Sequence, residues 1–97
     1  MKKSYKLELS AAAKRDLKRL PMSVQKDIVF NHLPIIENDP TAKSEPLSGA
    51  MKGERSYHFG RQPEYRIIFS MKNQIITVTI IGSRENIYKR AKRRGKT

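Results

Sequence analysis

The hydrophobic pattern changes its period along the chain, and this change separates a helical first half from a β second half. In residues 4–9 apolar and polar positions alternate, which is typical of a half-buried strand. Between Ser10 and Leu20 the apolar residues recur three and four positions apart, which predicts an amphipathic helix. Ser10 is placed to cap this helix, and Pro21 should end it.

A second helix is expected directly after the first, with a buried stripe of Val24, Ile28 and Leu33. Pro34 has no amide hydrogen and disfavours helical geometry at the residue before it, so we expect a kink or an end at Leu33. The two helices would form an αα-hairpin. The polar residues 41–55 are expected to be a long connection.

The remainder of the chain has the period of β-structure. Three strands are expected, at residues 56–59, 65–71 and 74–81. Gly82 should break the last strand, and residues 86–94 should form a short C-terminal helix. The predicted fold is therefore a single α+β domain over residues 1–97, with an N-terminal strand, a two-helix hairpin and a three-stranded antiparallel sheet segment.

Charge narrows the possible partners. The chain has 21 Lys and Arg residues against nine Asp and Glu, a formal net charge of +12, which favours binding to a nucleic acid or to an acidic protein. It has no cysteine and only two histidines, so we expect no disulfide, no metal site and no cofactor. The N-terminus does not read as a secretory signal, and no apolar run is long enough to span a bilayer, so a cytoplasmic location is expected.

Candidate chemistry lies on the first predicted β-hairpin. If the turn is symmetric about Gln62, then His58 lies opposite Arg66, while Tyr57 and Phe59 face the core. A guanidinium fork suits a phosphate, and an imidazole can donate or accept a proton near neutral pH. The alternative is that His58 is an ordinary surface residue and Arg66 a salt-bridge partner.

Two further candidates follow the last strand. Arg84 could hold a phosphate and offset the charge that builds up in a transition state. Tyr88 could stack on a base or contribute its hydroxyl, although it could equally anchor the C-terminal helix. His32 has no acidic or basic residue at useful helical spacing, and we interpret it as structural.

Three segments of the chain together resemble the RelE/ParE superfamily of toxins from type II toxin–antitoxin modules. Residues 46–49 (PLSG) resemble the L-x-G turn of that superfamily. Residues 64–69 (EYRIIF) resemble its Tyr-Arg strand, and residues 81–88 (IGSRENIY) resemble its Gly-x-Arg…Tyr ending. The resemblance covers nearly the whole chain and implies the same strand, helical hairpin and antiparallel sheet.

The resemblance also implies an activity. RelE-like toxins cut mRNA in the ribosomal A site through attack of a 2′-hydroxyl. By this resemblance Arg66 and Arg84 would stabilise the transition state, Tyr88 would lie near the 2′-hydroxyl or stack on a base, and His58 would protonate the leaving group. Ser56 replaces a lysine of RelE, which leaves the general base unassigned. The residues expected to contact RNA are Arg55, Arg61, Lys89, Arg90, Arg93 and Arg94.

The partners implied by the resemblance are an acidic antitoxin, the ribosome and mRNA. Two other functions remain open on the sequence. ParE-like toxins share the fold but inhibit DNA gyrase by binding it, and generally lack the acid–base residues. A basic module without catalytic activity would bind nucleic acid with a steep salt dependence and no turnover.

Overall fold

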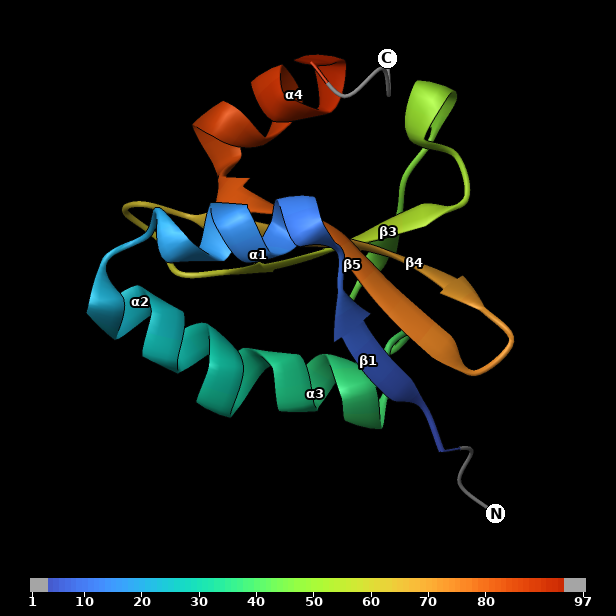
Figure 1. The fold of residues 1–97 in the computed structure, drawn as a ribbon. Helices are drawn as coiled ribbons and strands as arrows, with labels where there is room; N and C mark the ends of the chain where they lie inside the picture. Colours follow the sequence, from blue (N-terminus) through green and yellow to red (C-terminus); the bar gives the residue numbers. More distant parts are fainter. Residues whose placement is uncertain (1–3, 94–97) are drawn as a thin grey trace.

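The structure, a computed structural model, describes residues 4–93, apart from the side chains of Tyr88 and Lys92. A five-stranded sheet in the order β1-β5-β4-β3-β2 forms its centre (Figure 1). The strands are β1 (Lys6–Leu9), β2 (Glu45–Pro46), β3 (Glu54–Phe59), β4 (Tyr65–Lys72) and β5 (Ile75–Ser83). The predicted α+β class is confirmed.

The N-terminal strand lies at one edge of this sheet and makes it mixed. β1 pairs in parallel with β5, with Leu9 opposite Val78, whereas β5, β4, β3 and β2 pair antiparallel. The three expected antiparallel strands are present, and the sheet is wider than predicted because β1 and the two-residue β2 extend it. A parallel pairing between the two ends of a chain leaves no local periodic signal, which is why the pattern did not reveal it.

Helices cover both faces of the sheet (Figure 1). The helices are α1 (Ala11–Lys18), α2 (Met22–Asp27), α3 (Leu33–Asn38) and α4 (Arg84–Arg93). The hydroxyl of Ser10 accepts a hydrogen bond from the amide of Ala13 at 3.1 Å, so the predicted N-cap is confirmed. None of the helices described here is both long and apolar enough to cross a membrane.

The second predicted helix continues through Pro34 by a π-helical turn, η1 (Ile28–His32), that joins α2 to α3. The amide of Leu33 donates to the carbonyl of Ile28, five residues back. The expected end at Leu33 is therefore wrong, because the helix continues past the proline in α3. The alternative, a kink near Leu33, stays a prediction. Such single π turns often occur at functional sites.

The hydrophobic core has two parts, one on each face of the sheet. The larger part packs β3, β4 and β5 against α1, η1 and α3, with Ile28, Ile36 and Phe69 fully buried. The smaller part lies under α4 and consists of Met51, Ile68, Ile80, Ile87 and Ala91. The second face of the sheet therefore also carries buried apolar residues, because α4 folds back over it.

Three boundaries differ from the prediction. Residues 41–55 are not all irregular, since they contain β2, a 3₁₀ turn (Gly49–Met51) and the start of β3 at Glu54. Gly82 does not break the last strand and instead pairs with Arg66 inside the sheet. As a result β5 runs to Ser83 and α4 begins at once, at Arg84.

Candidate active site

The predicted hairpin register is confirmed. His58 lies opposite Arg66, Tyr57 opposite Ile67, and Phe59 opposite Tyr65. A register shifted by one residue would move the apolar set of β3 and β4 out of the core, and this is the physical reason the register is fixed. His58 is exposed, whereas the side chain of Arg66 is only 20% exposed. An imidazole and a guanidinium therefore share the face of the sheet that carries α4.

Glu64, which the sequence analysis did not single out, occupies the centre of this cluster. The Nε of Arg66 donates to its Oε2 at 3.0 Å. This hydrogen bond is the main reason that the pKa of Glu64 is lowered; partial burial opposes it, and the charges of Arg66, His58 and Arg84 lower it further. Three predicted site residues thus act electrostatically on one carboxylate.

A sequence signal for Glu64 existed. Glu64 and Glu85 are the only carboxylate residues after Glu54, in a stretch dominated by Lys and Arg. A lone acid two positions before Arg66 lies on the same face of an extended strand or at its entrance, within reach of that guanidinium. A rare carboxylate next to a predicted phosphate-binding arginine is therefore worth including among site candidates.

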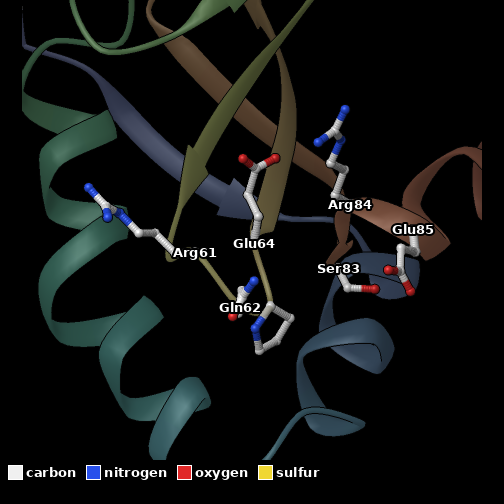
Figure 2. Close-up of a pocket in the computed structure, with 7 residues that line it drawn as sticks. Arg61, Gln62, Glu64, Ser83, Arg84 and Glu85 are labelled. Carbon is white, nitrogen blue, oxygen red and sulfur yellow. The ribbon is translucent and has the colours of Figure 1, made fainter.

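Arg84 is held beside Glu64 by the backbone. The amide of Arg84 donates to the carbonyl of Glu64 at 2.8 Å, which joins the first residue of α4 to the entrance of β4. Figure 2 shows the side chains of Glu64 and Arg84 extending to the same side of the sheet ends. The structure therefore brings His58, Arg66 and Arg84 together around Glu64.

A cavity of about 630 Å³ opens at this place, between the β3–β4 loop and the junction of β5 with α4 (Figure 2). The lining residues are Arg61, Gln62, Pro63, Glu64, Ser83, Arg84 and Glu85. Arg61 is exposed at its rim, where a basic side chain can meet an anionic ligand without a desolvation cost. A cavity that combines guanidinium groups with carboxylates suits a polar, phosphate-containing ligand.

Two of the arginines expected to contact RNA bind the protein itself. Arg55 donates from Nε to the hydroxyl of Ser44 at 2.6 Å and from Nη2 to the carbonyl of Ser44 at 2.9 Å, which fixes the segment before β2. Arg90 donates to the carbonyl of Ile81 at 2.6 Å and is only 17% exposed. These contacts give both guanidinium groups structural partners.

The other expected RNA contacts lie on or near α4. Lys89 and Arg93 are exposed on this helix. Tyr88 lies one helical turn after Arg84 in α4, with its side chain outside the described part of the molecule, and Arg94 lies outside the described residues. Ser56, on the same face of β3 as His58, is only 4% exposed, and its hydroxyl has no hydrogen-bond partner within the described residues.

His32 has an acidic partner, contrary to the sequence analysis. Its Nε2 lies 3.1 Å from Oδ2 of Asp27, and its Nδ1 lies 2.6 Å from the hydroxyl of Tyr57. Residues five apart do not meet on a regular α-helix, but the π turn brings Asp27 and His32 together. These contacts are compatible with a structural role for His32. The expectation that His32 has no acidic partner is wrong.

The arrangement can bind a phosphate and move protons. Arg66 and Arg84 supply positive charge, Glu64 supplies an ionised carboxylate, and His58 supplies an exposed imidazole. No cluster of three or more His, Cys, Asp or Glu side chains able to hold a metal ion occurs among residues 4–93.

Several solved structures share this fold. The fold matches the toxin in the RelBE2 toxin–antitoxin complex of Mycobacterium tuberculosis, with a TM-score of 0.75 and 20% identity over 84% of this chain and 99% of that one. It also matches a double mutant of Escherichia coli toxin RelE in the free state, with a TM-score of 0.71 and 20% identity over 95% and 98% of the two chains. A third match is the Escherichia coli DinJ–YafQ toxin–antitoxin complex, with a TM-score of 0.65 and 19% identity over 88% and 98%.

The family is defined by the sequence as well. A model of the ParE toxin of the type II toxin–antitoxin system parDE matches residues 7–88. This chain therefore belongs to the ParE toxin family, within the RelE/ParE superfamily. A search of curated proteins found no significant match.

Proposed function

We propose that this toxin is an mRNA endoribonuclease that acts in the ribosomal A site and so inhibits translation. The observation that carries the proposal is the convergence of His58, Arg66 and Arg84 on the carboxylate of Glu64. A protein that only binds a target has no need for an acid, a base and two phosphate-binding guanidinium groups in one place. We assign these four side chains to an in-line attack of a ribose 2′-hydroxyl on the neighbouring phosphate.

Arg66 and Arg84 bind the scissile phosphate in this mechanism. Their charges offset the negative charge that grows on the equatorial oxygens as the phosphorus becomes five-coordinate. Arg66 is pre-oriented by the carboxylate of Glu64 and is mostly shielded from solvent, which strengthens its interaction with the phosphate. Arg61 at the rim of the cavity, with Lys89 and Arg93 on α4, is placed to contact the flanking RNA backbone.

Glu64 is the general base that the sequence left unassigned. In the free protein its pKa is lowered, chiefly by the hydrogen bond from Arg66, so it is ionised at neutral pH but only weakly basic. When a phosphate oxygen takes the guanidinium of Arg66, that hydrogen bond and part of the positive field are lost. The pKa of Glu64 then rises, so substrate binding makes the carboxylate a stronger base for the 2′-hydroxyl.

His58 is the general acid. The 2′-oxygen forms a bond to phosphorus while the bond from phosphorus to the 5′-oxygen breaks, and Glu64 takes the proton from the 2′-hydroxyl. The imidazolium of His58 gives a proton to the departing 5′-oxygen. The products are a 2′,3′-cyclic phosphate and a 5′-hydroxyl, and a later proton exchange with solvent restores both side chains.

The proposed partners follow from charge and from the relatives. The net charge of +12 suits ribosomal RNA and mRNA in one state and an acidic antitoxin in the other. The RelBE2 match from Mycobacterium tuberculosis and the DinJ–YafQ match from Escherichia coli are solved as toxin–antitoxin complexes, which supports a cognate antitoxin here. A cytoplasmic location follows from a target on the ribosome.

A second candidate function is inhibition of DNA gyrase by binding. It is favoured by the description of the matching family model, a ParE toxin of parDE. Under this alternative the cluster around Glu64 has no catalytic task. Substitution of Arg66 would then affect gyrase inhibition only as far as it alters the binding surface.

The test is a primer-extension map of an mRNA in a purified translation reaction, with and without ribosomes. The wild type, Arg66→Ala and Arg19→Ala are compared, where Arg19 is an exposed arginine at the end of α1 and far from Glu64 in the sequence. We expect ribosome-dependent cuts at A-site codons with the wild type and Arg19→Ala, and none with Arg66→Ala. Wild-type cutting by Arg66→Ala would refute the mechanism, and absence of cutting together with inhibited supercoiling would favour gyrase.

A further inference from the structure

The end of β5 extends past the strand that pairs with its first half. β1 ends at Leu9, opposite Val78, whereas β5 continues to Ser83. Ile81 is fully buried in this overhang. A buried amide or carbonyl without a partner is destabilising, so the N–H and C=O groups of Ile81 need partners from another element.

Two ionic side chains from different helices supply these partners. Oδ2 of Asp16, in α1, accepts from the amide of Ile81 at 3.0 Å. Nη1 of Arg90, in α4, donates to the carbonyl of Ile81 at 2.6 Å and lies 3.5 Å from Oδ1 of Asp16. Asp16 is fully buried, in the apolar stripe of α1 between Ala13 and Leu17. The two side chains therefore form a clamp on one residue, since Asp16 binds the N–H of Ile81 and Arg90 binds its C=O.

Gly82 provides the space for this clamp. A Cβ added at Gly82 would lie 2.7 Å from Nη1 of Arg90 and 3.4 Å from its Cζ. The guanidinium thus crosses the backbone at the residue that pairs with Arg66 on β4. Glycine is required here for close approach of a side chain, which accounts for its place inside a strand. The clamp and the candidate active site are neighbours on the same sheet.

The clamp can influence the candidate active site through α4, the helix that carries both Arg90 and Arg84. Ile87 and Ala91 attach this helix to Ile68 and Ile80 by apolar contacts, which have no strong directional preference. Arg90, six residues after Arg84 in the same helix, adds a directional contact. We infer that Asp16 and Arg90 are a positioning pair that fixes the orientation of α4 and thereby holds Arg84 beside Glu64. This role in catalysis rests on the function proposed above.

Energetics support a geometric role for the pair. Replacement of a buried ion pair by apolar residues of similar volume is often neutral or stabilising, whereas removal of one partner leaves an uncompensated buried charge. A pair of this kind therefore adds little net stability, but it holds the two helices in a defined relative position. The double variant Asp16→Leu/Arg90→Met removes both charges together and so leaves no buried charge, but the N–H and C=O of Ile81 lose their side-chain partners. We expect it to fold with lower stability than the wild type.

The experiment measures the position of α4 and the reaction separately. The amide of Arg84 donates to the carbonyl of Glu64, so its hydrogen exchange reports whether the start of α4 is seated. In the double variant we expect Arg84 to exchange faster while the amides of β4 keep wild-type rates. We expect kcat for RNA cleavage to fall about tenfold or more with little change in KM, since Arg84 acts mainly on the transition state.

Two further variants keep the inference testable. Asp16→Asn retains an acceptor for the amide of Ile81 and removes only the ion pair, so its Arg84 exchange should lie between the wild type and the double variant. The control Glu8→Leu/Lys14→Met removes one negative and one positive charge at exposed positions of β1 and α1 and should match the wild type in both measurements.

The outcomes separate this inference from the proposed function. Wild-type exchange of Arg84 in both the double variant and Asp16→Asn would overturn the inference. So would faster exchange of all amides alike, because it would indicate a general loss of stability. If the wild type does not cut RNA, the proposed function fails, while selective exchange at Arg84 would still establish that the pair positions α4.

Discussion

The hydroxyl of Tyr57 lies 2.6 Å from Nδ1 of His32 and joins η1 to β3 from behind the candidate active site. The other ring nitrogen of His32, Nε2, lies 3.1 Å from the carboxylate of Asp27, which can only accept, so Nε2 is the donor. In the neutral imidazole Nδ1 then accepts from the hydroxyl of Tyr57. The imidazole also stacks on Phe59, with ring centroids 3.9 Å apart. Tyr57 and Phe59 flank His58 in the sequence, so this contact braces the strand that presents His58.

Loss of the Tyr57 hydroxyl should destabilise the protein without altering the sheet. Tyr57→Phe leaves the half-buried Nδ1 of His32 without its donor, and we expect a loss of about 1–2 kcal/mol in the free energy of unfolding. Urea denaturation monitored by circular dichroism measures this change. Tyr5→Phe, a substitution of the same kind in a partly buried tyrosine, is the control. Equal stability of the two variants would contradict the brace.

The phenol of Tyr57 should have a higher pKa than an ordinary tyrosine. Burial is the main cause that raises its pKa above 10.0, and the nearby charge of Asp27 adds to the effect. Ultraviolet difference absorbance against pH separates this group from the other tyrosines. Asp27→Asn removes the second cause and should lower the pKa of Tyr57 slightly. A pKa of Tyr57 at or below 10.0 would show that its ring is not buried as described.

The pKa of Glu64 should depend on Arg66. The hydrogen bond from Arg66 is the main cause that lowers it below 4.5. A group with a depressed folded-state pKa stabilises the fold above its unfolded pKa, and this contribution is lost as the pH falls through the folded value. Carboxyl-detected NMR titration should show the pKa of Glu64 rising toward 4.5 in Arg66→Ala. Arg61→Ala, which removes an exposed arginine that does not pair with Glu64, should change it far less.

The pH dependence of cleavage tests the assignment of the base. If phosphate binding releases Glu64 from Arg66, the acidic limb of kcat should lie at higher pH than that of kcat/KM, since the former reports the bound state. Glu64→Gln keeps an acceptor for Arg66 but cannot take a proton, and we expect a fall of about 10²-fold or more in kcat. A near wild-type rate in Glu64→Gln would remove Glu64 as the base.

The substitution Gly82→Ala should displace the guanidinium group of Arg90 more than it disturbs the sheet. The new Cβ would lie 2.7 Å from Nη1 of Arg90, and the guanidinium must shift because the strand backbone cannot. We expect a loss of about 1–3 kcal/mol in stability, as is usual for overpacking, measured by thermal denaturation. The control is Gly82→Ala in the background of Arg90→Met, where the guanidinium that the new Cβ would meet is absent and the further loss of stability should be smaller.

The sequence determined the local structure of this protein. Alternation in β3 and β4 set which side chains face the larger core, and a slip of one residue would have exposed Ile67 and Phe69. The opposition of His58 and Arg66 followed from that constraint and from the length of the turn. Ser10 likewise specified the start of α1, because a cap needs only neighbouring residues.

Tertiary structure decided which distant residues became partners. No local sequence pattern predicted that β1 would pair in parallel with β5. No such pattern predicted that Asp16 and Arg90 would meet at Ile81 either. The same holds for the meeting of Asp27 with His32, since a π turn changes the spacing at which helical residues meet. Periodicity reports burial of a face, whereas a contact between elements depends on how the chain closes in space. The physical reason is that hydrophobic burial is non-directional, while ion pairs and hydrogen bonds form only where packing has already brought their partners together.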